Sequence, residues 1–296
     1  MSILLILSKI LRAFVAKIKT AMKTHAGFTL VELLVASTIM LIVFAMVYTA
    51  FIQTRKVSLR NQMDIEILQN ARVGLDEMTR MLRMIGYQRD RVNGQVALIE
   101  AAPFQIIFNA DVYDDKTALP PKSTLHLYDA TTYVAPMQNY TTGAETIRWT
   151  LDTNDDGLVD GRDTNDDEEE RLTRQNPNDM VLIKEINGKR LTDRQIALGV
   201  LGPFDSREQR TDITPMFQYW LREADQSFAL LGDVNGDGQL DGDEKYFRAI
   251  TSQTILRSVR RIRMTITTES GGRDPFEPAK HRRVTLSSEV SLRNRE

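Results

Sequence analysis

An apolar run of 25 residues, from Phe28 to Ile52, carries a single charged side chain, Glu32. As a helix rising about 1.5 Å per residue, the run would be roughly 37 Å long, enough to cross the core of a bilayer with some tilt. A carboxylate inside such a span costs about 2.5–3.5 kcal/mol on insertion scales, so we expect it to be paired with a positive charge or to have a function. The run therefore predicts a membrane-spanning helix whose one acid has a function.

The spacing around Glu32 indicates where a positive partner comes from. If the chain is cut after Gly27, Phe28 carries a new ammonium group and Glu32 lies one helical turn away. The helix dipole also favours a negative charge in the first turn. The ammonium group of an adjacent subunit is an equally good partner, so the spacing alone leaves both pairings open.

The segment Gly27-Phe28-Thr29-Leu30-Val31-Glu32 resembles the processing site of type IV prepilins and of type II secretion pseudopilins. The resemblance implies that a prepilin peptidase cuts between Gly27 and Phe28 and that the new N-terminal Phe28 is methylated. It also implies that Glu32 pairs with the N-terminus of a neighbouring pilin or pseudopilin during assembly. The alternative is an ordinary signal anchor in which Glu32 is incidental.

Residues 1–27 form the expected leader, which is basic and contains no acid. Its apolar and basic residues are compatible with an amphipathic helix on a membrane surface. Leaders of this family are usually shorter, and translation from Met22 would leave one of six residues, so both starts stay open. Positive charge before the span predicts a cytoplasmic N-terminus in a single-pass inner-membrane protein, with the rest of the chain outside the cytoplasm. After processing, the protein is expected at the cell surface in a pilus.

Composition fits an exported domain. Removal of the leader leaves 269 residues and takes the formal net charge from −2 to −7, because the leader holds five Lys and Arg. Binding of nucleic acid by bulk charge is therefore not indicated. The chain has no cysteine. An exported domain without disulfides needs another source of rigidity, and a metal ion is one.

The helical pattern continues beyond the span with a changed polarity. Apolar residues recur at spacings of three and four on an otherwise polar helix, at Ile65, Leu68, Ala71, Leu75, Met78, Leu82 and Ile85. No proline precedes Pro103, so one helix is expected from Phe28 to about Ile85, with Gly86 as its C-cap. The stripe covers only three heptads, which favours packing on a sheet over a coiled coil.

The rest of the sequence is rich in β-strand patterns. Short segments are followed by two long alternating ones near the C-terminus, and the short ones are 104–110, 123–129, 146–152, 180–186 and 216–220. Residues 70–87 and roughly 255–294 resemble the corresponding parts of minor pilins of the PilW type. The predicted fold is α+β and pilin-like, with a leader (1–27), a transmembrane and polymerisation helix (28–52), its amphipathic half (53–86) and a β-rich domain (87–296).

Two twelve-residue segments in the β-rich region fit the calcium-loop pattern D-x-[DN]-x-[DN]-G. Calcium prefers six to eight oxygen ligands, and the pattern brings side chains, one carbonyl and a closing acid together around a tight turn. The first loop supplies Asp152, Asn154, Asp156, Leu158, Asp160 and Asp163, and the second supplies Asp233, Asn235, Asp237, Gln239, Asp241 and Glu244. The sequence predicts about two calcium ions as cofactors.

Other readings of these loops stay open. Acidic, Asn- and Gly-rich segments also occur as ordinary surface turns. Paired calcium loops occur in dockerins and EF-hand proteins, but there helices flank each loop, whereas these loops lie 81 residues apart in β-rich sequence. We therefore expect stabilising insertions in a sheet domain and not a calcium sensor.

No catalytic pattern accompanies these features. The three histidines, His25, His126 and His281, lie far apart without metal spacing, and the sequence has no cysteine nucleophile, G-x-S-x-G or phosphate loop. We expect a structural protein, a minor pilin that helps to prime or cap a type IV pilus serving adhesion, motility or DNA uptake. The alternatives are a minor pseudopilin at the tip of a type II secretion pseudopilus, or a calcium-binding surface protein with one membrane span that never polymerises.

Overall fold

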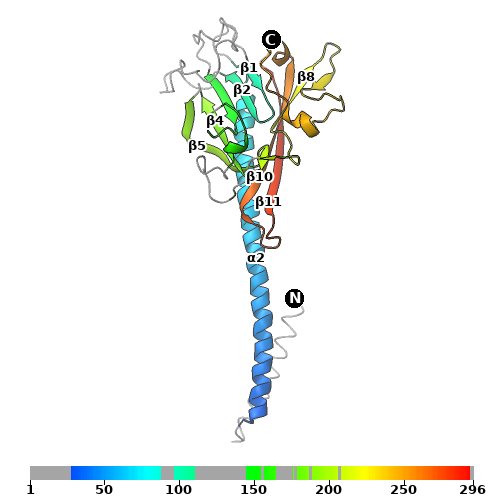
Figure 1. Cartoon of the computed structure of the whole chain (residues 1–296). Helices are drawn as coiled ribbons and strands as arrows, with labels where there is room; N and C mark the ends of the chain where they lie inside the picture. Colours follow the sequence, from blue (N-terminus) through cyan, green and yellow to red (C-terminus); the bar gives the residue numbers. More distant parts are fainter. Residues whose placement is uncertain are drawn as a thin grey trace. The chain divides into compact units, whose positions relative to one another are not determined.

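The computed structural model describes residues 28–87, 97–110, 145–154, 157–164, 176, 179–186, 189–205 and 208–293. The chain divides into two compact units, Met1–Ser58 and Leu59–Glu296, and each is described by itself. In the second unit, the C-terminal part of a long helix packs on an antiparallel β-sheet (Figure 1). This is the predicted pilin-like α+β fold.

The long helix, α2, runs from Leu30 to Leu82. Its last hydrogen bonds tighten into a turn, because Met84 and Ile85 donate to carbonyls only three residues back. Gly86 follows with φ of 72° and donates to the carbonyl of Asn109 at 2.9 Å. The regular helix therefore begins two residues later and ends three residues earlier than predicted, while the chain leaves it at the predicted glycine.

Among the described residues, nine strands form one sheet and two more form a small hairpin. The large sheet contains β1 (Leu98–Ala101), β2 (Gln105–Ala110), β3 (Glu145–Thr150), β4 (Met180–Ile186), β5 (Lys189–Val200), β8 (Phe217–Arg222), β9 (Phe228–Leu230), β10 (Val259–Arg273) and β11 (His281–Ser291). The hairpin pairs β6 (Phe204–Asp205) with β7 (Glu208–Gln209). Short helical segments lie at Gly161–Asp163 (η3), Gly242–Tyr246 (η4) and Gln253–Leu256 (α3).

Strand β10 joins the two parts of the large sheet. It pairs with β11 over most of its length, from Arg261 opposite Ser291 to Arg273 opposite His281. It also pairs with β8 near its start, where Met264 lies opposite Phe217, and with β5 further along, where Thr268 lies opposite Val200. The strands β1 to β5 and the strands β8 and β9 are thus connected through one long strand.

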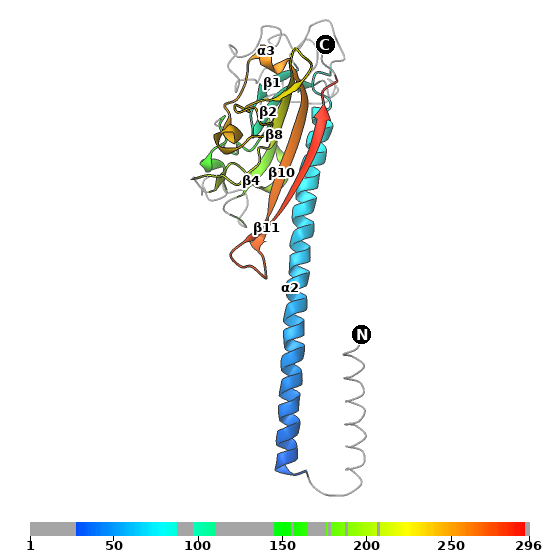
Figure 2. The ribbon, with the colours of Figure 1, turned by 90° about the vertical axis from the view of Figure 1, so that its right-hand side faces the viewer.

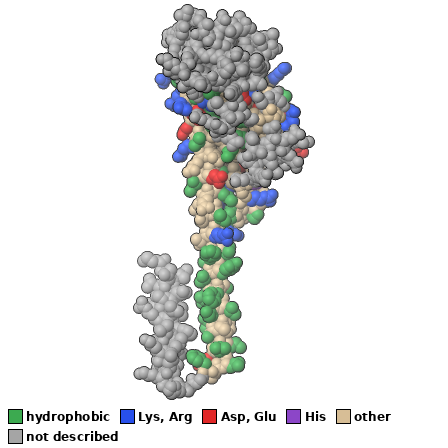
Figure 3. Space-filling view, turned by 90° about the vertical axis from the view of Figure 1, so that its left-hand side faces the viewer, with side chains coloured by type: hydrophobic (Ala, Val, Ile, Leu, Met, Phe, Trp, Pro, Cys, Tyr) green, Lys and Arg blue, Asp and Glu red, His purple; other side chains and the backbone are tan. Residues whose placement is uncertain are grey.

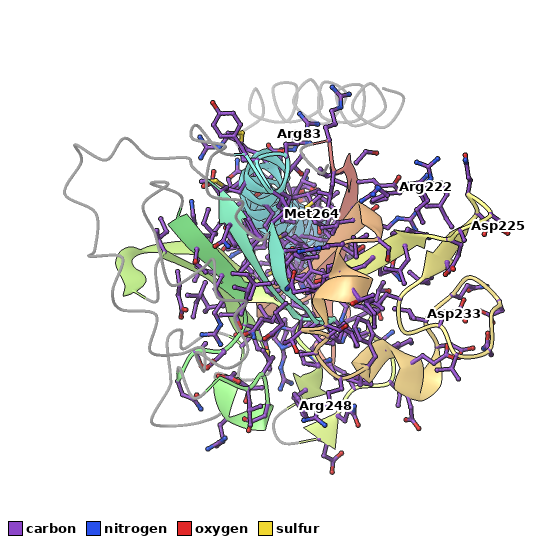
Figure 4. All side chains as sticks on the ribbon, turned by 90° about the horizontal axis from the view of Figure 1, so that it is seen from above. Arg83, Arg222, Asp225, Asp233, Arg248 and Met264 are labelled. Carbon is purple, nitrogen blue, oxygen red and sulfur yellow. The ribbon has the colours of Figure 1, made fainter. Side chains whose placement is uncertain are left out.

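The core lies between the helix and the sheet. The helix contributes Ile67, Ala71, Gly74, Leu75, Met78, Met81 and Leu82 as its buried residues. From Ala71 onward these follow the predicted stripe, but Ile65 is 55% exposed and was wrongly assigned to it. The stripe starts instead at Ile67, because Ile67 and Ala71 are one turn apart and share a face. From the sheet, Ile262, Met264 and Ile266 alternate inward, and Met264 lies close to the helix when viewed along it (Figure 4).

Polar contacts also fix the helix to the sheet. The Lys184 ammonium group on β4 lies 3.0 Å from a Glu77 carboxylate oxygen and is itself buried. At the other side, Arg282 of β11 pairs with Asp64 at 2.9 Å, and β11 runs beside the helix (Figure 2). The Thr268 hydroxyl donates to the carbonyl of Ile67 at 2.9 Å. These contacts connect the helix to three strands of the sheet, β4, β10 and β11.

Most of the predicted strands exist. The segments 104–110, 146–152, 180–186 and 216–220 overlap β2, β3, β4 and β8, and the two long segments are β10 and β11. The predicted segment 123–129 lies outside the described residues. Strands β1, β5, β6, β7 and β9 were not predicted, and β6, β7 and β9 are only two or three residues long, too short to show a pattern.

Gly74 lies where the helix closely approaches β5 and β10. A methyl group at this position would lie 2.9 Å from Cδ1 of Ile266 and 3.0 Å from Cβ of Ala197. Both contacts are shorter than normal van der Waals distances. The Cβ atom of Ala197 is fixed by the main chain of β5, so a change of side-chain rotamer cannot relieve the contact. The absence of a side chain at this position therefore sets the spacing between helix and sheet.

We predict that Gly74→Ala destabilises the domain despite the better helix propensity of alanine. Overpacking costs about 1–3 kcal/mol, and the gain in propensity returns at most about 1 kcal/mol. Urea unfolding of the full chain in detergent checks this against Gln69→Ala, an exposed control on the same helix that should change stability by less than about 0.5 kcal/mol. Equal stability of both variants would contradict the tight contact.

Candidate functional site

The N-terminal half of α2 exposes an almost continuous apolar surface. Phe28, Leu30, Leu33, Phe44 and Phe51 are each more than half exposed. Hydrophobic side chains cover this part of the helix in the space-filling view (Figure 3). The helix is long and apolar enough to cross a membrane, and none of its most apolar window is buried in the protein. This surface is thus not the core of a soluble domain, although a signal sequence would pass the same test of length and composition.

Glu32 is held at the start of this helix by Thr29. A Glu32 carboxylate oxygen accepts hydrogen bonds from the Thr29 main-chain N–H and hydroxyl, both at 3.1 Å. In return, the Glu32 N–H donates to the Thr29 hydroxyl oxygen at 3.3 Å. This reciprocal arrangement is a capping box, in which a Thr and a Glu three residues later satisfy each other's main-chain groups. We did not predict this capping box, although the spacing Thr-x-x-Glu is its known signal.

The capping box orients the carboxylate without neutralising it. Both partners from Thr29 are uncharged donors, so the negative charge of Glu32 is still available to a cation. The processing residue Gly27 lies outside the described residues, and Phe28 is 73% exposed next to this carboxylate. The arrangement keeps a charged acceptor at the end of an apolar helix, where an ammonium group from the same or another chain can approach.

The second acidic loop is closed by its last acid, Glu244. One Glu244 carboxylate oxygen accepts from the N–H groups of Val234 and Asn235 at 2.9 and 3.2 Å, and the other accepts from Asp241 at 3.4 Å. At the start of the loop, Asp233 accepts from Gly238 at 2.8 Å. Asp233 lies at the outer margin of the domain, away from the helix (Figure 4).

The first acidic loop repeats this hydrogen-bond pattern position by position. One Asp163 oxygen accepts from Thr153 and Asn154 at 2.6 and 3.4 Å, and the other accepts from Asp160 at 2.8 Å. Asp152 accepts from Gly157 at 2.9 Å. The glycine at the sixth position has φ of +90° in this loop and +80° in the second. Two segments far apart in sequence therefore fold into the same closed turn.

The two loops differ in burial and in charge. Asp152 and Asp163 are almost fully buried, whereas Asp237 and Asp241 are exposed. Burial raises the pKa of Asp163 to about 6, against the hydrogen bonds from the main chain of Asp160 and Thr153. The nearby Asp152 carboxylate adds to this rise. Asp156, a predicted ligand of the first loop, lies outside the described residues.

Among the described residues, neither loop has its acids gathered around a common point. Within the part of the chain that the structure describes, no group of three or more His, Cys, Asp or Glu side chains is assembled as a metal site. The loop side chains accept main-chain N–H groups instead, as the Asn235 amide oxygen does from Asp237 and the Asp237 carboxylate does from Gln239, both at 2.8 Å. The oxygen-rich composition and the closed turn suit a hard cation, and the assembly of its ligands remains a prediction.

Comparison with known families identifies the N-terminal segment. A family model described as the prokaryotic N-terminal methylation motif matches residues 22–48. By this motif and its fold, the chain is similar to type IV pilins and pseudopilins. No curated protein and no solved structure matched the chain significantly. The match covers the helix start with Glu32 and leaves the β-rich domain without an identified relative.

This pilin-like identity confirms several of the broader predictions. The motif implies processing by a prepilin peptidase and assembly with other pilins. Together with the exposed apolar helix, it is consistent with anchoring in the inner membrane followed by incorporation into a pilus. Pilin-family proteins are structural and non-enzymatic, as the lack of a catalytic pattern in the sequence led us to expect.

We predict that the mature chain begins with methylated Phe28. Gly27 is the small residue between the basic leader and the apolar run, and Glu32 follows it at the spacing that a new ammonium group requires. Mass spectrometry of the N-terminal peptide from assembled material measures both the cut and the methyl group. Retention of Met1 or Met22 in that material would contradict the predicted processing.

Proposed function

We propose that the protein is a minor pilin of the PilW type that helps to prime or cap a type IV pilus. The observation that carries this proposal is the methylation motif on an exposed apolar helix, with the capped but unneutralised Glu32 at its start. Such a helix is suited to a bundle of like helices in which the carboxylate of one subunit meets the ammonium group of the next. The proposed partners are the major and other minor pilins.

The size of the β-rich domain supports a minor position in the filament. The unit that begins at Leu59 holds a nine-stranded sheet and two acidic loops in its described part. In a filament built on packed helices, every repeated subunit needs lateral room for its domain. A domain this bulky fits best at an end, where neighbours are missing on one side. The resemblance of residues 70–87 and 255–294 to PilW-type proteins supports the same position.

A minor pseudopilin of a type II secretion system is the second candidate. It has the same N-terminal chemistry, and a bulky domain at a filament tip suits it equally. Deletion of the gene separates the two proposals, because loss of a pilus primer removes surface pili, whereas loss of a pseudopilin blocks the export of secreted enzymes. Retention of both functions would favour a surface protein with one span that does not polymerise.

We predict that Glu32→Ala leaves membrane insertion and processing intact but reduces incorporation into filaments by at least about tenfold. Removal of the acid lowers the cost of the span and deletes the charge that an ammonium group would meet. Immunoblots of sheared pili and of membrane fractions measure both quantities. Glu66→Ala, an exposed acid further along the helix, serves as the matched control. Normal incorporation of Glu32→Ala would exclude the pairing role.

We also propose that calcium stabilises the domain. In the second loop the candidate ligands are Asp233, Asn235, Asp237, Asp241 and Glu244 side chains with the carbonyl of Gln239, and all belong to a closed turn at the surface. None of these acids forms an ion pair within the described residues, so their mutual repulsion is left to solvent or to a cation. A bound ion would offset this repulsion in a domain that has no disulfide.

We predict that millimolar calcium raises the melting temperature of the full chain in detergent and that a chelator reverses the rise. At about 100 times the dissociation constant, binding to the native state adds about 2.7 kcal/mol. Asp237→Asn should abolish most of the difference, whereas Asp76→Asn on the exposed face of the helix should keep it. An unchanged melting temperature in chelator would show that the loops are acidic turns without a stabilising ion.

A further inference from the structure

Arg148 lies fully inside the β-rich domain beside the first acidic loop. Its side chain is 2% exposed, and its guanidinium group contacts carboxylates on two segments. One terminal nitrogen is 3.2 Å from both oxygens of Glu185, which is its cross-strand neighbour on β4. The other lies 2.5 Å from Asp152, the first residue of the loop.

A third strand completes the surroundings of this arginine. The Arg148 Nε donates to the Gln105 side-chain oxygen on β2 at 2.9 Å. The guanidinium group thus has partners on β2, on β4 and in the loop, and it is held in one position. A buried charge is tolerated only when it is paired and hydrogen-bonded in this way.

Two acids of the first loop are therefore paired with cations of the protein, whereas among the described residues those of the second loop are not. Asp152 is paired with Arg148, and Asp160 is paired with the exposed Arg162 at 2.8 Å. In the second loop, no acid from Asp233 to Glu244 forms an ion pair within the described residues. The nearest basic residue in sequence, Lys245, donates instead to the carbonyl of Thr211 at 3.1 Å.

We infer that Arg148 supplies the positive charge of the first loop from inside the protein, so that this loop stays closed without calcium and only the second loop responds to the ion. A calcium ion at Asp152 would have to share the carboxylate with a guanidinium group, and the two cations repel each other. Displacement of Arg148 would leave a buried charge without one of its partners. The chain then takes up one calcium ion, and not the two that the sequence pattern predicts.

This inference rests on the proposed calcium site of the second loop, but it makes a separate statement about the first. Since the two loops share their hydrogen-bond pattern, the same amides report on both. The N–H groups that donate to Asp163 in the first loop correspond to those that donate to Glu244 in the second. Their protection from hydrogen exchange measures whether each loop is closed.

Hydrogen exchange of the full chain in detergent, in chelator and in millimolar calcium, tests the inference. At about 100 times the dissociation constant, calcium should slow exchange in peptides that cover residues 233–244 by up to about 100-fold. Peptides that cover residues 152–164 should be protected in chelator and change by less than about twofold. Calorimetry should give one bound ion per chain. Slowing of both loops by calcium, or two bound ions, would overturn the inference.

Substitution of the arginine provides the second measurement. Arg148→Gln should open the first loop in chelator and make its protection depend on calcium, whereas Arg148→Lys should retain much of the protection. Arg162→Gln, which removes the exposed cation of the same loop, is the matched control. If Arg148→Gln leaves the first loop equally protected in chelator, Arg148 does not have this role. If Arg148→Gln fails to fold, the wild-type comparison still decides.

The two proposals fail in different ways. If the second loop ignores calcium and no ion binds, the calcium proposal is wrong, whereas a first loop that is protected in chelator and opened by Arg148→Gln still supports the internal cation. If the second loop binds calcium and the first loop also closes only with calcium, the calcium proposal stands and the role of Arg148 is wrong.

Discussion

The charge of Glu32 in an apolar helix is the constraint on which the rest of the molecule depends. The helix itself offers this carboxylate only the N–H and hydroxyl of Thr29, and neither removes the charge. A charged carboxylate inside the lipid bilayer has a free-energy cost, and a cation close to the carboxylate lowers that cost. The cation that we propose is the N-terminus of a neighbouring subunit. Repetition of a head-to-tail contact that does not close on itself produces a filament.

The second half of the helix has a different role, because it packs against the β-rich domain and is attached to it by specific contacts. Gly74 brings the helix close to β5 and β10, the buried pair Lys184 and Glu77 ties it to β4, and Arg282 ties it to β11. The apolar face and these ion pairs act on one continuous element. From Leu59 onward, the helix and the sheet therefore form one compact unit without disulfides.

The sequence was sufficient for the features that depend on local pattern. The apolar run, the position of Gly86 and the alternation in β10 and β11 could be read from residue spacing alone. The sequence was insufficient where residues far apart in the chain determine the contacts and the burial of a side chain. Nothing near Asp152 in sequence shows that Arg148 is paired with Glu185 from another strand. The spacing of Ile65 likewise does not show that the sheet covers the neighbouring face of the helix, where Asp64 and Ile67 make their contacts, and leaves Ile65 exposed. The capping box of Thr29 was readable and was overlooked.

The central claim is that Glu32 meets the N-terminus of another pilin in the assembled state. A photoreactive amino acid introduced at Leu33, adjacent to the acid and 67% exposed, tests it most directly in sheared filaments. The account predicts cross-links from this position to the N-terminal peptide of a neighbouring mature pilin, and their loss when Glu32→Ala is added. Cross-links to lipid alone, or cross-links that persist without the acid, would contradict it.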